Sequence, residues 1–208
     1  MQRTRSKSPR RLNTCRSTSS CSALRLPFSR QPAGAQTLYS AGAAEITAKP
    51  AADFLGTIDP ATPVKVLEKK GAQTKVEISG WALKEYPSQI FKEAGLRIEY
   101  ASFDEEGVVK LNPKAGEKTV QGNVWQRATA TGWVPSDALT PNLEKLWKAG
   151  EARHADACSS CHPAPKANHF TANQWASQLP VRGGRTGHTR RGNNALMFKW
   201  LQEHAKPM

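Results

Sequence analysis

The sequence predicts an α+β fold: a small β-barrel followed by a small helical domain, after a disordered basic N-terminus. Three observations support this. Short runs with partial period-two alternation recur between residues 55 and 140, apolar residues at helical spacing begin after Thr140, and residues 1–35 show almost no apolar periodicity. We therefore divide the chain into a tail (1–35), a linker (36–54), a β module (55–140) and a helical domain (141–208).

The tail accounts for most of the chain's formal net charge of +13. The chain has 30 Lys and Arg against 17 Asp and Glu, and residues 1–30 hold basic residues but no acidic one. A segment so rich in Ser, Arg and Pro cannot bury enough surface to offset its ordering entropy, so we expect disorder. Because the charge is not held on one rigid face, it does not predict nucleic-acid binding. No apolar run approaches about 18 residues, so we expect no transmembrane segment.

The β module is predicted from five short runs separated by Gly- or Pro-containing turns. In the second run Val76 and Ile78 point to one face and the charged residues to the other. The runs are residues 64–67, 74–78, 96–100, 108–111 and 123–127. Residues 75–81 and 124–139, with a Gly-Trp-Val step, resemble the last strands of the bacterial SH3-like barrel. We interpret Trp81, Trp125 and Trp133 as core residues of such a barrel; a ligand groove is the alternative.

Two helices are predicted after the β module. Thr140 is a plausible N-cap, with Pro141 at the first helical position. The apolar stripe of this first helix continues to a small residue at Gly150, where another element can approach closely. Its members are Leu143, Leu146 and Trp147. A second helix, about 194–205, places Leu196, Met197, Trp200 and Leu201 on adjoining faces. We expect the two helices to cross near Gly150.

Between these helices lies the motif that carries the chemistry. Cys158, Cys161 and His162 form C-x-x-C-H, the spacing for c-type haem attachment. The two thiols reach the two vinyl groups on one edge of the porphyrin, and His162 supplies an axial imidazole nitrogen to the iron. This predicts one covalent haem c and an electron carrier rather than an enzyme. No Ser/His/Asp or paired-carboxylate pattern argues for catalysis.

Other readings of the same cysteines are weaker. A zinc site needs a second ligand pair, and Cys15 and Cys21 lie in the low-complexity tail. A redox-active dithiol is expected near a βαβ pattern, which the sequence lacks. A disulfide between Cys158 and Cys161 leaves His162 without a role. The motif therefore favours haem.

Around the motif the sequence resembles a known family. Residues 143–147, 158–166, 168–175 and 199–206 are similar to the C-terminal monohaem domain of the pentahaem c-type cytochrome subunit that serves trimethylamine-N-oxide reductase. The resemblance extends over about 36–208. It implies a periplasmic protein of anaerobic respiration that takes electrons from an upstream quinol-oxidising or multihaem donor and passes them to a terminal reductase.

The chain departs from this family pattern in three ways. It has one C-x-x-C-H motif rather than five, and neither a membrane anchor nor an export signal is visible. Residues 1–35 stand where the family has its tetrahaem region, and 182–193 are unusually rich in Arg and Gly, so either segment can reflect truncation or an altered reading frame. Near Arg182 the family pattern leads us to expect a methionine ligand.

The second axial ligand of the iron is therefore open, with Met197 and His188 as candidates. Met197 lies within the predicted last helix, where a core role competes, and His188 lies in a loop. His169 follows His162 too closely to span the ring, and we expect His154 to be a surface helix residue. Two other functional hypotheses stay open: a haem-free SH3-like binding module and a non-functional truncated cytochrome.

Overall fold

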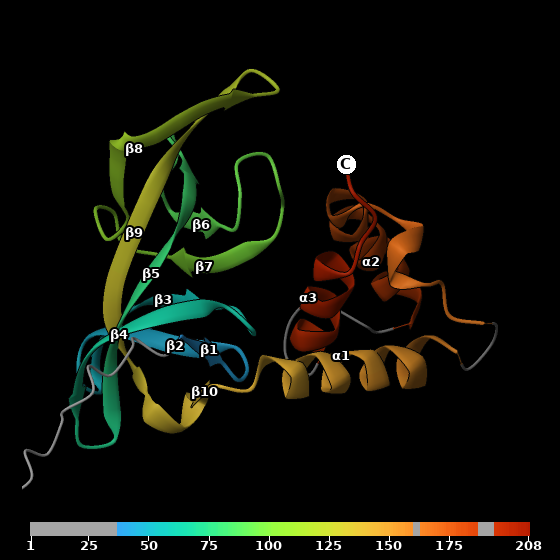
Figure 1. The fold of residues 1–208 in the computed structure, drawn as a ribbon, viewed down its shortest axis with the longest axis horizontal. Helices are drawn as coiled ribbons and strands as arrows, with labels where there is room; N and C mark the ends of the chain where they lie inside the picture. Colours follow the sequence, from blue (N-terminus) through green and yellow to red (C-terminus); the bar gives the residue numbers. More distant parts are fainter. Residues whose placement is uncertain (1–36, 160–162, 187–193) are drawn as a thin grey trace, which may run out of the picture. The chain divides into compact units, whose positions relative to one another are not determined.

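The computed structural model describes residues 37–159, 163–186 and 194–208 (Figure 1). The predicted disordered tail, residues 1–35, lies outside this part of the chain. The strands are β1 (Leu38–Ser40), β2 (Ala44–Lys49), β3 (Ala52–Ile58), β4 (Pro63–Lys70), β5 (Gln73–Leu83), β6 (Gln89–Phe91), β7 (Glu99–Phe103), β8 (Lys110–Val120), β9 (Asn123–Pro135) and β10 (Leu139–Thr140). The helices are α1 (Leu143–Cys158), α2 (Ala172–Thr186) and α3 (Ala195–Glu203), with short 3₁₀ turns at Ser136–Ala138 and Ala167–His169.

Six of the strands close into a ring. Their order is β5-β6-β7-β3-β2-β9, and β9 returns to pair with β5. This last pairing is antiparallel and runs from Gln73↔Pro135 to Leu83↔Trp125. Strand β8 extends the sheet beyond β9, and β4, β1 and β10 extend it beyond β5. Each strand of the ring therefore has a neighbour on both sides, although the β5–β6 and β2–β9 pairings each consist of a single residue pair.

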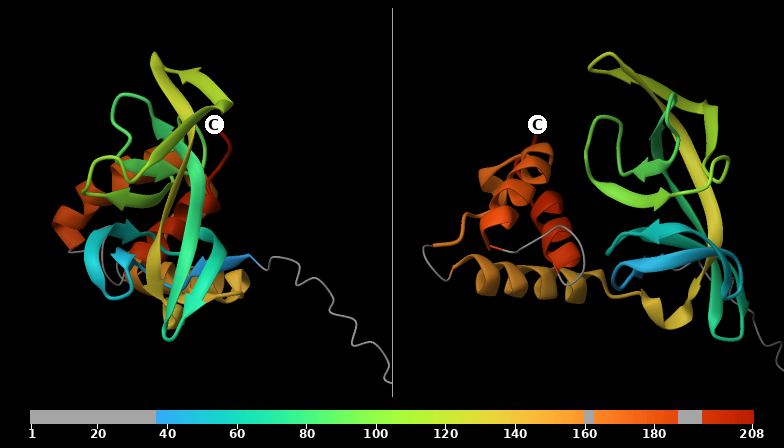
Figure 2. Two further views of the ribbon diagram at one scale, coloured as in Figure 1. Left: turned by 90° about the vertical axis from the view of Figure 1, so that its left-hand side faces the viewer. Right: turned by 180° about the vertical axis from the view of Figure 1, so that it is seen from behind.

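The interior of the barrel follows from side-chain alternation. In β5 Thr74, Val76 and Ile78 are fully buried while the intervening residues are partly exposed, as expected for a strand with one face in the core. Where β2 meets β9, a Cβ on Gly132 would lie 2.4 Å from Cγ1 of Ile46, so only glycine lets the two strands approach this closely. Figure 2 shows the ring from the side and from behind.

The tryptophans of the β module are buried, as predicted. Trp81, Trp125 and Trp133 are 4 %, 8 % and 7 % exposed. Trp81 and Trp125 form a small cluster with Ala94, apart from the main barrel core. The guanidinium of Arg127 lies 4.5 Å from the Trp81 ring centroid, a cation–π contact that covers the ring. These rings therefore serve packing, and the groove alternative is not needed to explain them.

The helices form an apolar cluster of their own. Asn142, rather than Thr140, is the N-cap of α1: its side chain accepts a hydrogen bond from the backbone N of Lys145 at 2.9 Å. The predicted crossing near Gly150 is confirmed, since a Cβ at that position would lie 2.7 Å from Cβ of Trp200 in α3. The buried members of the cluster are Ala167, Trp175, Ala176, Leu179, Met197, Phe198, Trp200 and Leu201.

The predicted α+β fold class with a separate helical cytochrome domain is wrong. Strands hold more of the described residues than helices do, so the chain is mostly β, built on a closed six-strand barrel. Residues 34–208 cluster as one compact unit that contains both the barrel and the three helices. None of the described helices is long and apolar enough to cross a membrane.

The physical reason is a set of hydrogen bonds that fastens the helices to the barrel. The carbonyls of Gly95, Arg97 and Glu99 stand at alternate positions of the segment that leads into β7. All three accept hydrogen bonds from side chains of the helices. Asn173 of α2 donates to Gly95 at 2.8 Å, and Gln202 of α3 donates to Arg97 at 2.7 Å. Lys199 of α3 donates to Glu99. The Asn173 side chain also accepts from the backbone N of Arg97 at 2.7 Å. Polar side chains therefore join two apolar cores.

Candidate haem-attachment site

Helix α1 carries the motif to the apolar cluster of the helices. Its last residue is Cys158, which is partly buried and packs with Ala157 against that cluster. Cys161 and His162, the other two predicted site residues, lie outside the described residues. The structure therefore places the first residue of the predicted attachment motif at the C-terminus of α1. This helix crosses α3 near Gly150.

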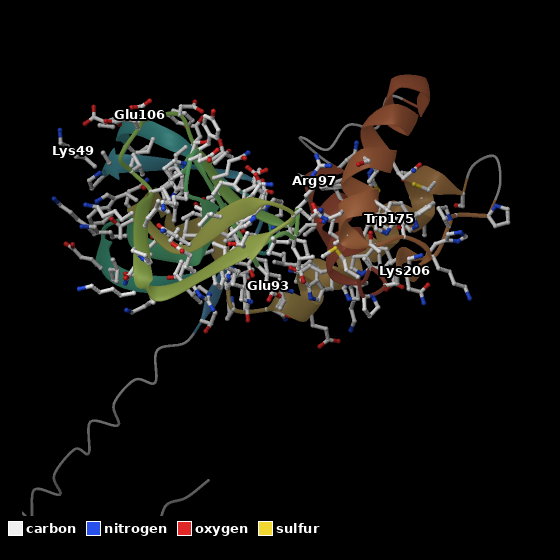
Figure 3. The ribbon with its side chains drawn as sticks, turned by 90° about the horizontal axis from the view of Figure 1, so that it is seen from above. Lys49, Glu93, Arg97, Glu106, Trp175 and Lys206 are labelled. Carbon is white, nitrogen blue, oxygen red and sulfur yellow. The ribbon has the colours of Figure 1, made fainter. Side chains whose placement is uncertain are left out.

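The segment that follows the motif is held by two ring nitrogens. His154 Nε2 lies 2.9 Å from the carbonyl oxygen of Pro165, and Trp175 Nε1 donates to the carbonyl of Ala167 at 2.7 Å. The backbone N of His169 then donates to Lys166 at 2.9 Å in the short 3₁₀ turn. Figure 3 labels Trp175 among the helices. Residues 165–167 are thereby attached to both α1 and α2.

His154 is not the surface residue that the sequence analysis predicted. It is 5 % exposed, and its ring centroid lies 5.5 Å from that of Trp200 and 6.3 Å from that of Trp175. The signal was available, because His154 follows Gly150 by four residues and so continues the same helical stripe. The apolar stripe was predicted only as far as Gly150, because a histidine does not count as apolar.

The surroundings of Cys158 suit a haem. The cluster against which it packs is built from indole, phenyl, aliphatic and thioether side chains, which provide the low dielectric that a porphyrin face needs. Met197, one of the two candidate axial ligands, is fully buried in this same cluster. His188, the other candidate, lies outside the described residues. A cleft of about 400 Å³ lies beside His154, Trp200 and residues 164–168.

One buried polar atom near the motif has no hydrogen-bond partner among the described residues: Nδ1 of His154. Within the described residues there is no cluster of three His, Cys, Asp or Glu side chains able to bind a metal ion.

Two titratable groups at the junction between α3 and the barrel are strongly perturbed. Burial lowers the pKa of Lys199 to about 8, and the carboxylates of Asp59, Glu203 and Glu99 oppose that shift. Burial also raises the pKa of the Tyr100 hydroxyl well above its usual value, and the charge of Glu203 adds to this effect. The Lys199 amine lies 5.0 Å from the Tyr100 ring centroid. The junction therefore favours the neutral forms of both groups.

Comparison with known proteins decides the family. The family model described as the TorC third cytochrome c domain matches residues 32–139. The chain belongs to this family. The matched residues are those of the barrel, and the C-x-x-C-H motif at 158–162 lies beyond them. No solved structure is significantly similar to the chain.

The relatives of this TorC-family chain match a larger share of it than the family model does. Cytochrome c-type protein TorC of Escherichia coli O157:H7 is 31 % identical over 193 residues, which is 88 % of this chain and 49 % of the relative. TorC of Escherichia coli strain K12 is 31 % identical over 81 % of this chain and 44 % of its own length. Cytochrome c-type protein TorY of Haemophilus influenzae is 29 % identical over 66 % of this chain and 38 % of its own length. The chain thus spans about half the length of the TorC proteins it matches.

These matches confirm the resemblance inferred from the residues around the motif. A cytochrome c family consists of electron carriers with covalently bound haem c, not of enzymes. The prediction of an electron carrier therefore agrees with TorC-family membership.

Proposed function

We propose that this chain is a periplasmic electron-transfer cytochrome that carries one haem c on Cys158 and Cys161, with His162 as an axial iron ligand. The single observation that carries the proposal is the C-x-x-C-H motif at the end of α1, in a chain of a cytochrome c family. When bound, the haem supplies a one-electron redox couple. A domain boundary near residue 140, with the β module before it and a helical segment (141–208) after it, is part of the same proposal.

The role of the chain's own residues follows from their positions. Helix α1 presents the Cys158 thiol against the apolar cluster, and the crossing at Gly150 fixes that helix on α3. The cluster excludes water from one side of the site, which sets the dielectric around the redox centre. The three carbonyl contacts at 95–99 then fix the helices on the barrel. The barrel serves as the rigid base of the redox segment.

The partners are proposed by analogy with the TorC relatives. A multihaem or quinol-oxidising protein would deliver electrons, and a terminal reductase such as trimethylamine-N-oxide reductase would accept them. The chain's formal net charge of +13 favours an acidic partner surface. We expect the association rate to fall as ionic strength rises, and a rate independent of salt contradicts this electrostatic part.

Met197 and His188 are the candidates for the second axial position. Met197 shares the apolar cluster with Cys158, which supports it, whereas its complete burial also suits a purely structural role. A near-infrared sulfur-to-iron charge-transfer band that disappears in Met197→Leu identifies the thioether. A bis-histidine spectrum that disappears in His188→Ala identifies the imidazole.

The deciding experiment is a pyridine haemochrome spectrum of the chain made with an export signal and haem-attachment machinery. We expect a c-type α-band that survives acid–acetone extraction. The control is the double variant Cys158→Ala, Cys161→Ala, which should lose all haem on extraction. A wild-type chain without covalent haem under these conditions refutes the proposal and returns attention to the haem-free binding module.

A further inference from the structure

The attachment motif begins on α1, and the segment just after it contacts the same helix. Cys158 is the last residue of α1, and Pro165, three residues past the motif, is bound by His154, one turn before Cys158 in α1. The His154 contact therefore holds the described residues after the motif at the side of α1.

The chemistry of the contact assigns the state of the imidazole. A carbonyl oxygen can only accept, so Nε2 of His154 carries the proton and donates it to Pro165. Nδ1, the other ring nitrogen, is buried without a hydrogen-bond partner among the described residues. The contact therefore assigns the Nε2–H tautomer to His154.

Trp175 is a second hydrogen-bond donor to this segment, beside His154. Trp175 of α2 donates to the carbonyl of Ala167, two residues beyond Pro165, and its ring meets that of His154 edge-on at an interplanar angle of 81°. The two carbonyls are bound from two helices by ring N–H groups; the Trp175 bond is buried and the His154 bond is partly buried. Breaking either bond removes a hydrogen bond that holds this segment.

We propose that His154 is a positioning residue of the haem site: its Nε2–H bond to Pro165 holds residues 163–167 against α1 and so fixes the return of the chain after C-x-x-C-H. The effect on the haem rests on the proposed function, whereas the hydrogen bond between His154 and Pro165 does not depend on haem. Groups that hold metal ligands in place from outside the ligand set commonly tune affinity and potential.

The test uses three variants of the full chain, made with and without haem. His154→Phe keeps an aromatic ring but removes both nitrogens, and His154→Gln retains an amide N–H at about the reach of Nε2. His204→Phe is the matched control, because His204 also lies among the tryptophans but bonds through Nδ1 to Trp200 of its own helix, at 2.9 Å.

In the haem-free chain, amide hydrogen exchange of the peptide covering 163–170 measures whether the His154–Pro165 hydrogen bond protects this segment. Loss of one buried hydrogen bond should speed exchange roughly tenfold in His154→Phe. His154→Gln should recover most of the protection, and His204→Phe should exchange like the wild type. Equal exchange in all three overturns the proposal. Imidazole ¹⁵N shifts of the wild-type chain test it without any variant: the Nε2–H tautomer supports it and the Nδ1–H tautomer overturns it.

The haem-loaded chain tests whether the His154 contact affects haem attachment and the midpoint potential. His154→Phe should show a shifted midpoint potential and a smaller attached fraction, neither of which changes in His204→Phe. An unchanged potential and attached fraction, together with faster exchange, overturns the positioning role. If the wild type attaches no haem, the proposed function fails, and the hydrogen-exchange result still decides whether the contact exists.

Discussion

Lys199 makes the stability of the chain depend on pH in an unusual direction. Its amine is fully buried, donates to the carbonyl of Glu99 and has a pKa lowered from 10.5 to about 8, chiefly by burial. The unfolded chain keeps the ordinary value, so between pH 8 and pH 10.5 the unfolded state binds more protons. Stability must then rise with pH across this window, and the destabilising effect of the charged amine is fully present below pH 8.

The magnitude follows from the size of the shift. A difference of about two and a half pKa units corresponds to roughly 3 kcal/mol when complete. Tyr100 acts oppositely above pH 10, because its raised pKa makes ionisation unfavourable in the folded state. Between pH 8 and pH 9.5 the Lys199 effect dominates at this junction, and we expect the free energy of unfolding to increase by about 2 kcal/mol.

Urea unfolding monitored by tryptophan fluorescence at both pH values measures this increase. Lys199→Met removes the titrating amine and should flatten the dependence, whereas Lys69→Met, at an exposed lysine of β4, should leave it unchanged. If Lys199→Met keeps the wild-type dependence, another group is responsible and the assignment fails.

Two further predictions concern the helices. Gly150→Ala should lower the free energy of unfolding by about 1–2 kcal/mol, since overpacking against Trp200 outweighs the gain in helix propensity. The matched control Gly42→Ala, with no atom within 4 Å of its new Cβ, should stay within about 0.5 kcal/mol in urea unfolding. Trp175→Phe should cost about 1–3 kcal/mol, because the carbonyl of Ala167 loses its buried donor. A thermal unfolding midpoint equal to that of the wild type contradicts this last expectation.

The sequence predicted the strands whose side chains alternate most clearly. The expected run 74–78 lies inside β5, which continues to Leu83 because it pairs with β9 along its whole length. Of the expected run 96–100, only Glu99 and Tyr100 lie in a strand, because β7 begins at Glu99. The carbonyls before it are bound by side chains of α2 and α3 instead of a neighbouring strand. Residues 36–54, expected as a linker, contain β1, β2 and the start of β3. These segments are short and contain alanine, so their period-two alternation of apolar and polar residues is too weak to predict strands.

What the sequence did not predict depends on polar side chains. Apolar periodicity gave the helix pair and its crossing at Gly150, yet the attachment of the helices to the barrel rests on Lys199, Gln202 and Asn173. A hydrophobic pattern treats such residues as solvent-facing and assigns a separate helical domain. His154 was missed for the same reason. Of the predicted site, Cys158 and Met197 are brought into one cluster.

The closure of the ring has a consequence for the order of events during synthesis. Strand β2 meets β9 through Thr47 and Trp133, which are 86 residues apart, so the ring cannot close before residue 135 has been made. Such distant pairing is slow, because a long loop must be ordered first. Every residue of the ring is thus synthesised before α1 and before Cys158 and Cys161.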